Sequence, residues 1–150
     1  MKSLVRKALA VIICIFVANV GVMASNDKPI TVSQLPQAAQ HVLKTEFKGR
    51  KVALSKMESG LISKSYDVIF TNGDKIEFDR NGNWTDIECK KSGVPANLVP
   101  SQIRQYVKKN YSSQRIVEIE KKRGSYEVKL SKGVELTFNK NFKVTHVDMD

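Results

Sequence analysis

The spacing of apolar residues along the chain changes from threes and fours to twos, and it does so twice. Spacings of three and four mark the buried stripe of a helix. Two segments show this spacing: Leu35, Ala39, Val42, Leu43 and Phe47, and later Val99, Ile103, Tyr106, Val107 and Tyr111. Each is followed by stretches in which apolar and polar residues alternate, as in half-buried strands. The pattern therefore predicts a helix followed by a sheet, written twice.

Aligning the two halves shows an internal repeat. Residues 35–47 match residues 99–111 at a shift of 64, and residues 66–70 match residues 126–130 at a shift of 60, so the first copy carries four extra residues in between. Repeats decide the architecture of a chain before any other pattern. We therefore predict an α+β fold of two tandem modules, 25–90 and 91–150. Each module is expected to be a helix packed on one face of a four-stranded antiparallel sheet.

Capping and turn residues set the expected boundaries of these helices and strands. Ser33 and Asn97 are expected to cap the two helices, with a proline in the first turn. The pairs Asn72-Gly73 and Asn81-Gly82 predict two-residue hairpin turns, since Asn and Gly accept positive φ. The strands are then expected at about 51–58, 63–71, 74–80, 83–89, 115–121, 124–131, 134–139 and 142–148, with 90–96 as linker. The residues expected under the helices are Tyr66, Val68, Phe70, Ile76 and Phe78, and Tyr126, Val128, Leu130, Leu136 and Phe138.

The first 24 residues have the features of a secretory signal. Lys2, Arg6 and Lys7 precede an apolar run, 8–22, and Ala24 is the expected cleavage site. A single membrane anchor is the alternative, although about 15 apolar residues fall short of the ~20 that span a bilayer as a helix. We therefore expect a periplasmic or secreted protein with no stable membrane insertion after cleavage.

Composition narrows the classes of partner and of chemistry. The formal net charge is +10, and the three basic residues of the signal leave +7 for the mature chain. Basic proteins favour nucleic acid, anionic lipid or acidic proteins, but export argues against nucleic acid. Once Cys14 is removed with the signal, Cys89 is alone, which predicts a small apolar strand residue, with an intermolecular disulfide as the alternative.

Several motifs together resemble those of one known family. They are the Leu35-Pro36 helix start, Tyr66-x-Val68, Asn72-Gly73 and the segment 78–84, Phe-Asp-Arg-Asn-Gly-Asn-Trp. The chain resembles the PepSY-like family of exported Bacteroidetes proteins, which is similar to the β-lactamase-inhibitor-protein fold. The resemblance implies tandem helix-plus-sheet modules and, in function, an inhibitor or chaperone of a protein or peptidase. Because fold does not carry function, it assigns no binding residue.

Catalytic motifs are missing from the sequence. His41 and His146 lie in no recognisable motif, and no phosphate loop, HExxH or Cys-x-x-Cys is present. We therefore expect no enzyme, no cofactor and no metal. The alternative is a metal-dependent or hydrolytic activity that uses the acidic cluster of the first repeat, which includes Asp79 and Asp86.

The uncovered face of the first sheet is the predicted binding surface for a protein or peptide of the cell envelope. A two-residue turn at Asn81-Gly82 places Trp84 opposite Asp79, on the open face with Glu77 and Asp86. A one-residue bulge would turn Trp84 inward, and the sequence leaves both open. The outer face of the second module is expected to be basic, because residues 91–150 hold twelve Lys and Arg against six Asp and Glu. The oligomeric state is left open.

Overall fold

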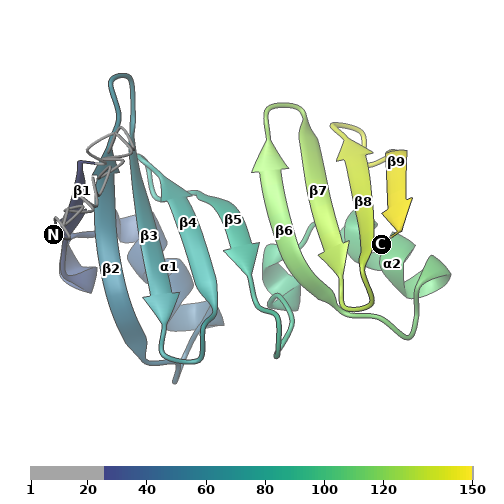
Figure 1. Cartoon of the computed structure of the whole chain (residues 1–150), viewed down its shortest axis with the longest axis horizontal. Helices are drawn as coiled ribbons and strands as arrows, with labels where there is room; N and C mark the ends of the chain where they lie inside the picture. The colour runs from purple at the N-terminus through teal and green to yellow at the C-terminus, as the bar shows by residue number, and fades with distance from the viewer. Residues whose placement is uncertain (1–25, 150) are drawn as a thin grey trace, which may run out of the picture.

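The computed structural model describes residues 26–149, and the predicted signal with Cys14 lies outside them. Within this range nine strands form one antiparallel sheet in chain order, with two helices on one face (Figure 1). The elements are β1 (Asp27–Pro29), α1 (Gln37–Glu46), β2 (Val52–Ser59), β3 (Lys64–Phe70), β4 (Lys75–Asp79), β5 (Trp84–Glu88), α2 (Ser101–Asn110), β6 (Ile116–Lys122), β7 (Ser125–Leu130), β8 (Val134–Asn139) and β9 (Val144–Met149). The predicted α+β class is confirmed, with a helix ahead of each group of four strands.

The two groups of strands are joined edge to edge into a single sheet. β5 pairs with β6 through Asp86 with Glu120, Ile87 with Ile119, and Glu88 with Glu118. β1, which the apolar pattern did not predict, adds one more strand beside β2. β1 has three residues and contains Pro29, so it offers no alternation to recognise and lies at a sheet edge, where proline is tolerated.

Both helices begin later in the chain than expected if Ser33 and Asn97 were their caps. Ser33 and Asn97 lie instead within short 3-10 turns, Val32–Gln34 and Ala96–Leu98, and the helices start directly after Pro36 and Pro100. The reason is that a residue before proline is disfavoured in the helical region. Leu35 is accordingly extended, with ψ of 153°.

The predicted hairpins are present, but their turns have three residues. In the β4–β5 turn the Gly82 N–H donates to the Asp79 carbonyl at 3.0 Å, and Gly82 alone takes positive φ, 83°. A type I turn closed by a left-handed residue has this geometry. In the second repeat the equivalent position is Phe142, with φ of 59°, whose ring stacks on Tyr126 at 5.6 Å between centroids.

One hydrophobic core lies between the sheet and both helices. The residues predicted to lie under the helices all belong to it, with Tyr66 and Tyr126 half-buried at its margin and the other eight buried. Ile87, Cys89 and Ile119 carry the core across the junction of the repeats. Among residues 26–149, no helix is long and apolar enough to cross a bilayer.

The β4–β5 turn packs against the start of α1, which makes Gly82 more constrained than Gly73 of the β3–β4 turn. A Cβ at Gly82 would lie 2.8 Å from both the Ala39 N and the Pro36 Cβ, whereas one at Gly73, with φ of 90°, would meet nothing within 4 Å. We expect Gly73→Ala to cost about 1 kcal/mol of unfolding free energy from backbone strain, and Gly82→Ala on the order of 3 kcal/mol from strain plus overpacking. Urea unfolding of both variants checks the difference, and equal losses would contradict the packing of the turn on α1.

Candidate binding face

The face of the sheet opposite the helices collects most of the carboxylates of the chain. Paired residues of neighbouring strands share a face, and successive residues alternate between faces. By this register, twelve of the 15 acidic residues lie on the helix-free side: Asp27, Glu58, Asp67, Glu77, Asp79, Asp86, Glu88, Glu118, Glu120, Glu127, Glu135 and Asp148. We call these twelve residues the acidic face. Four lysines of the strands share the same side, Lys56, Lys75, Lys122 and Lys129. A fifth, Lys90, follows β5 and reaches this side with its Nζ 2.6 Å from Glu88.

Five carboxylates of the acidic face form a row across five neighbouring strands. Asp67 pairs with Glu77, Glu77 with Asp86, Asp86 with Glu120, and Glu120 with Glu127. Adjacent strands lie about 4.8 Å apart, and like charges directly opposite one another destabilise a sheet. The row therefore concentrates negative potential across the middle of the sheet.

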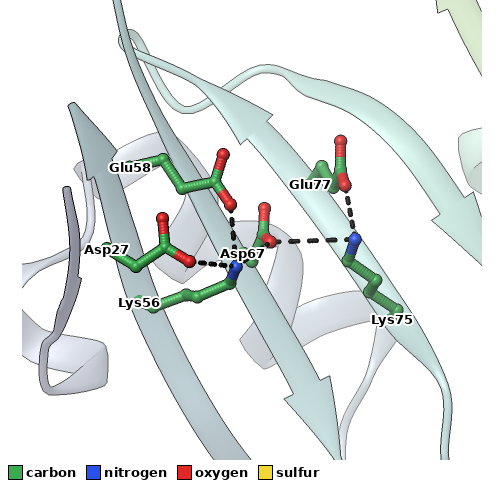
Figure 2. Close-up of polar contacts among 6 residues, drawn as sticks. All are labelled: Asp27, Lys56, Glu58, Asp67, Lys75 and Glu77. Carbon is green, nitrogen blue, oxygen red and sulfur yellow. Dashed lines mark hydrogen bonds and ion pairs between the residues drawn. The ribbon is translucent and has the colours of Figure 1, made fainter. Parts of the chain in front are cut away.

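Two lysines compensate one end of this row. Lys56 Nζ lies 2.7 Å from Glu58, 2.9 Å from Asp27 and 3.2 Å from Asp67 (Figure 2). Hydrogen bonds to Glu58 and then to Asp27 raise the pKa of Lys56 above its usual range. Lys75 Nζ lies between two carboxylates, 3.7 Å from the buried Asp67 and 2.5 Å from Glu77. Two lysines are thus shared among four carboxylates here, and both carboxylates at this end of the row, Asp67 and Glu77, have a lysine partner.

The other end is compensated by two lysines of the second repeat. Lys122 Nζ lies 2.6 Å from Glu127 and 3.4 Å from Glu120. In the next row of the sheet, Lys129 bridges Glu135 at 2.8 Å and Glu118 at 3.7 Å. The centre of the row, between Lys75 and Lys122, holds no lysine.

Asp86 occupies that centre, at the junction of the two repeats. It has no ion-pair partner among residues 26–149, and its Oδ1 is buried without a hydrogen bond there. Burial first, and then the charges of Glu118, Glu77 and Glu120, raise the pKa of Asp86 to about 6. A positively charged group beside Asp86 would therefore relieve the repulsion from Glu118, Glu77 and Glu120.

The predicted site residues Glu77 and Asp86 are brought together, opposite each other on the open face. Asp79 lies at the end of the same face, but its carboxylate is engaged in the turn. Asp79 Oδ1 accepts hydrogen bonds from the backbone N–H groups of Asn81, at 2.9 Å, and Asn83, at 3.0 Å. Its role in the structure is to hold the β4–β5 hairpin.

The expected open-face position of Trp84 is wrong. Trp84 pairs with Phe78, which is fully buried on the helix side, and it is half-buried against the core. The cause is a β-bulge in β5, opposite Glu77 and Phe78, which adds one residue to that strand. Because of this extra residue, Trp84 at the start of β5 points to the face opposite to the one expected. The alternative of an inward-turning bulge is the one present.

The expected basic outer face of the second repeat is also wrong. Glu118, Glu120, Glu127, Glu135 and Asp148 make that face acidic, and with His146 they line a hollow of about 290 Å³. The excess of Lys and Arg lies elsewhere, on α2 and in the turns. The total charge of residues 91–150 does not indicate which face the acidic residues occupy. The alternation of Glu118, Ile119 and Glu120 predicts two carboxylates on one face of a strand.

The remaining candidate groups have structural positions. His41 is exposed on α1 and His146 on β9. Cys89 is buried, as predicted for an apolar strand position, and burial raises the pKa of its thiol to about 11. In the described part of the chain, no group of three or more His, Cys, Asp and Glu residues could hold a metal ion.

Comparison with known proteins identifies relatives of this arrangement. A family model described as "Putative beta-lactamase-inhibitor-like, PepSY-like" matches residues 64–146. The chain belongs to the PepSY-like family. No curated protein matches the chain.

Solved structures from Bacteroides agree with this membership. A Bacteroides vulgatus protein is 52% identical, with a TM-score of 0.81 over 83% of this chain and 98% of its own. A Bacteroides thetaiotaomicron protein, described as a "putative calcium-regulated periplasmic protein", is 48% identical, with a TM-score of 0.79 over 81% and 96%. A second Bacteroides vulgatus protein is 35% identical, with a TM-score of 0.76 over 81% and 98%. All three are described as periplasmic, which confirms the expected localisation of this PepSY-like protein, and no description names a catalytic activity.

The raised pKa of Asp86 predicts a change of stability with pH. Because the folded protein holds the Asp86 proton more tightly than the unfolded chain does, stability falls as the pH rises from about 4 through about 6. We expect Asp86→Asn to raise the free energy of unfolding at pH 7.5 by about 1 kcal/mol, a value discounted for solvent screening at this half-buried site. The gain should vanish below about pH 4.

Chemical denaturation at several pH values measures this effect. Glu46→Gln is the matched control, since Glu46 lies on α1 away from the acidic face. A destabilised Asp86→Asn variant at pH 7.5 would contradict the assignment of Asp86 as an uncompensated carboxylate.

Proposed function

We propose that this PepSY-like protein is a non-catalytic periplasmic binding protein that holds a basic segment of another protein or peptide on its acidic face. The observation that carries the proposal is the segregation of charge: twelve carboxylates against five lysines on the side that no helix covers. The fold buries its apolar residues on the other side, so this side of the sheet is open to a partner.

The centre of the acidic face supplies the chemistry of recognition. Asp86, Glu77 and Glu120 face one another without a lysine between Lys75 and Lys122. A Lys or Arg side chain of the partner would relieve this repulsion and give Asp86 Oδ1 a hydrogen-bond donor. The surrounding negative potential would speed the encounter at low ionic strength.

Two finer roles are compatible with this chemistry. An inhibitor would cover a basic rim of a peptidase, and a chaperone would hold a basic stretch of an unfolded or maturing chain. Both roles need the helix-free face of the sheet and no catalytic group of this protein. The resemblance to inhibitor-like folds supports the first role at the level of architecture.

A divalent cation is the second candidate for the acidic face. The relative described as a putative calcium-regulated periplasmic protein favours it, and carboxylate oxygens are the ligands that Ca²⁺ prefers. Against it, no group of three or more potential ligands in residues 26–149 is arranged to hold an ion. Asp79, which a metal-dependent or hydrolytic activity would use, is engaged in its turn. The basic segment is therefore the better-supported guest.

Fluorescence anisotropy with labelled peptides tests the proposal. We expect the protein lacking residues 1–24 to bind a Lys- and Arg-rich peptide at low salt and to leave a Glu-rich peptide of equal length unbound. Asp86→Asn and Glu77→Gln should each weaken binding by about fivefold, the equivalent of ~1 kcal/mol for one lost charge pair. Glu46→Gln should leave it unchanged, because Glu46 lies on α1.

Two results would count against the basic segment. Equal binding of both peptides would show that charge does not select the guest. Stoichiometric binding of Ca²⁺ that Asp86→Asn abolishes, without any peptide binding, would favour the cation instead.

A further inference from the structure

The tip of the β2–β3 hairpin exposes two large aliphatic side chains. Residues 60–63 project beyond the end of the sheet (Figure 1), closed by a hydrogen bond from the Gly60 N–H to the Ser63 carbonyl at 2.9 Å. Leu61 is 107% exposed and Ile62 is 96% exposed, more than the other exposed large apolar residues described. Apolar surface of this size in water is unfavourable, so the pair requires an explanation.

The repeat shows that the fold does not need this tip. β2 aligns with β6 at a shift of 64 and β3 with β7 at a shift of 60, so the four extra residues of the first copy fall in this hairpin. The equivalent β6–β7 hairpin closes tightly at Arg123-Gly124. Leu61 and Ile62 therefore belong to an addition that leaves the core unchanged.

Basic side chains extend from the tip along the same end of the sheet. Because the strands run in an antiparallel meander, the turns 60–63, 80–83, 123–124 and 140–143 all lie at one end, which we call the finger end (Figure 1). Its exposed basic residues without an ion pair among residues 26–149 are Lys64, Arg80, Lys121, Arg123, Lys140 and Lys143.

The layout of these charges fits a plane better than a pocket. Strands lie about 4.8 Å apart, so the basic turns from β3 to β9 extend over roughly 30 Å. A pocket in a partner protein would engage the apolar tip and leave most of the row unused. A surface of phosphate headgroups engages both, because basic residues bind anionic lipid while aliphatic residues enter the boundary of the acyl chains.

We propose that the finger end docks reversibly on an anionic lipid surface, with Leu61 and Ile62 inserted at the interface and the basic turns against the phosphates. The strands then stand upright on the membrane. The acidic face points sideways and stays open, so this docking is independent of the proposed binding of a basic segment.

Vesicle sedimentation with the protein lacking residues 1–24 tests the apolar part. We expect binding to vesicles rich in phosphatidylglycerol and little binding to pure phosphatidylcholine. The double variant Leu61→Ser with Ile62→Ser should lower partitioning on the order of tenfold. Leu54→Ser is the matched control, since Leu54 is also exposed, at 41%, but lies within β2. It should partition like the unchanged protein.

A pair of triple variants tests the charges. Lys64→Gln, Arg123→Gln and Lys140→Gln together should lower partitioning on the order of a hundredfold, at roughly fivefold for each basic residue near the surface. Lys51→Gln, Lys91→Gln and Lys132→Gln remove the same charge from exposed residues at the opposite end of the sheet. The second triple variant should partition nearly as the unchanged protein does.

Insertion is seen directly with an environment-sensitive dye. A dye on Ile62→Cys should shift to the blue with anionic vesicles, whereas one on Ser113→Cys, at the opposite end, should not; Cys89 is buried and stays unlabelled. Equal losses from the two triple variants would overturn the proposal, as would unchanged binding of the Leu61 and Ile62 double variant. Absence of vesicle binding would also overturn it and would point to an apolar pocket of a partner protein.

Discussion

The pairing of β5 with β6 is the contact on which the rest of the architecture depends. On the helix side it brings Ile87 against Ile119, and both are fully buried in the shared core. On the other side it sets Asp86 against Glu120 and Glu88 against Glu118. Burying an isoleucine contributes about 1.5–3 kcal/mol, whereas a cross-strand charge pair is worth ~0.2–1 kcal/mol. Apolar burial therefore decides the junction, and the repulsion is left on the open face.

The alternation of apolar and polar residues predicts which side chains lie on each side of this sheet, except where a turn or bulge adds a residue to a strand. Val68, Phe70, Ile76 and Phe78 lie under α1 as predicted, because each strand keeps its alternation. Trp84 does not follow, since the three-residue turn and the bulge beyond it add a residue that Asn81-Gly82 does not announce. The two repeats place their bulges at equivalent points, Glu77/Phe78 and Thr137/Phe138. This register is a property of the repeated scaffold, and one copy of the pattern could not show it.

A local sequence pattern does not predict β1 or the acidic row, because both depend on pairing between segments that are distant in the sequence. β1 exists because Asp27, Lys28 and Pro29 find the edge of β2, and the three residues alone have no strand signal. The carboxylates of the acidic row lie next to one another only when five strands pair in register. The positive net charge of residues 91–150 therefore does not predict this row. The sequence predicts that Glu77 and Asp86 lie side by side, because both belong to one predicted hairpin. Glu118 and Glu120 lie across the junction of the repeats, which no local pattern predicts.

The charges of this protein are sorted by position in the sheet. Side chains that point out of the helix-free face are mostly acidic, and those in the turns at its ends are mostly basic, so a chain of positive net charge still presents a negative surface. The two kinds of surface lie at right angles, since turns close the ends of strands whose side chains stand perpendicular to the sheet. Contact at the finger end therefore leaves the acidic face uncovered. Changes at Leu61 or Arg123 and changes at Asp86 or Glu77 should act independently, because neither pair shares a partner with the other.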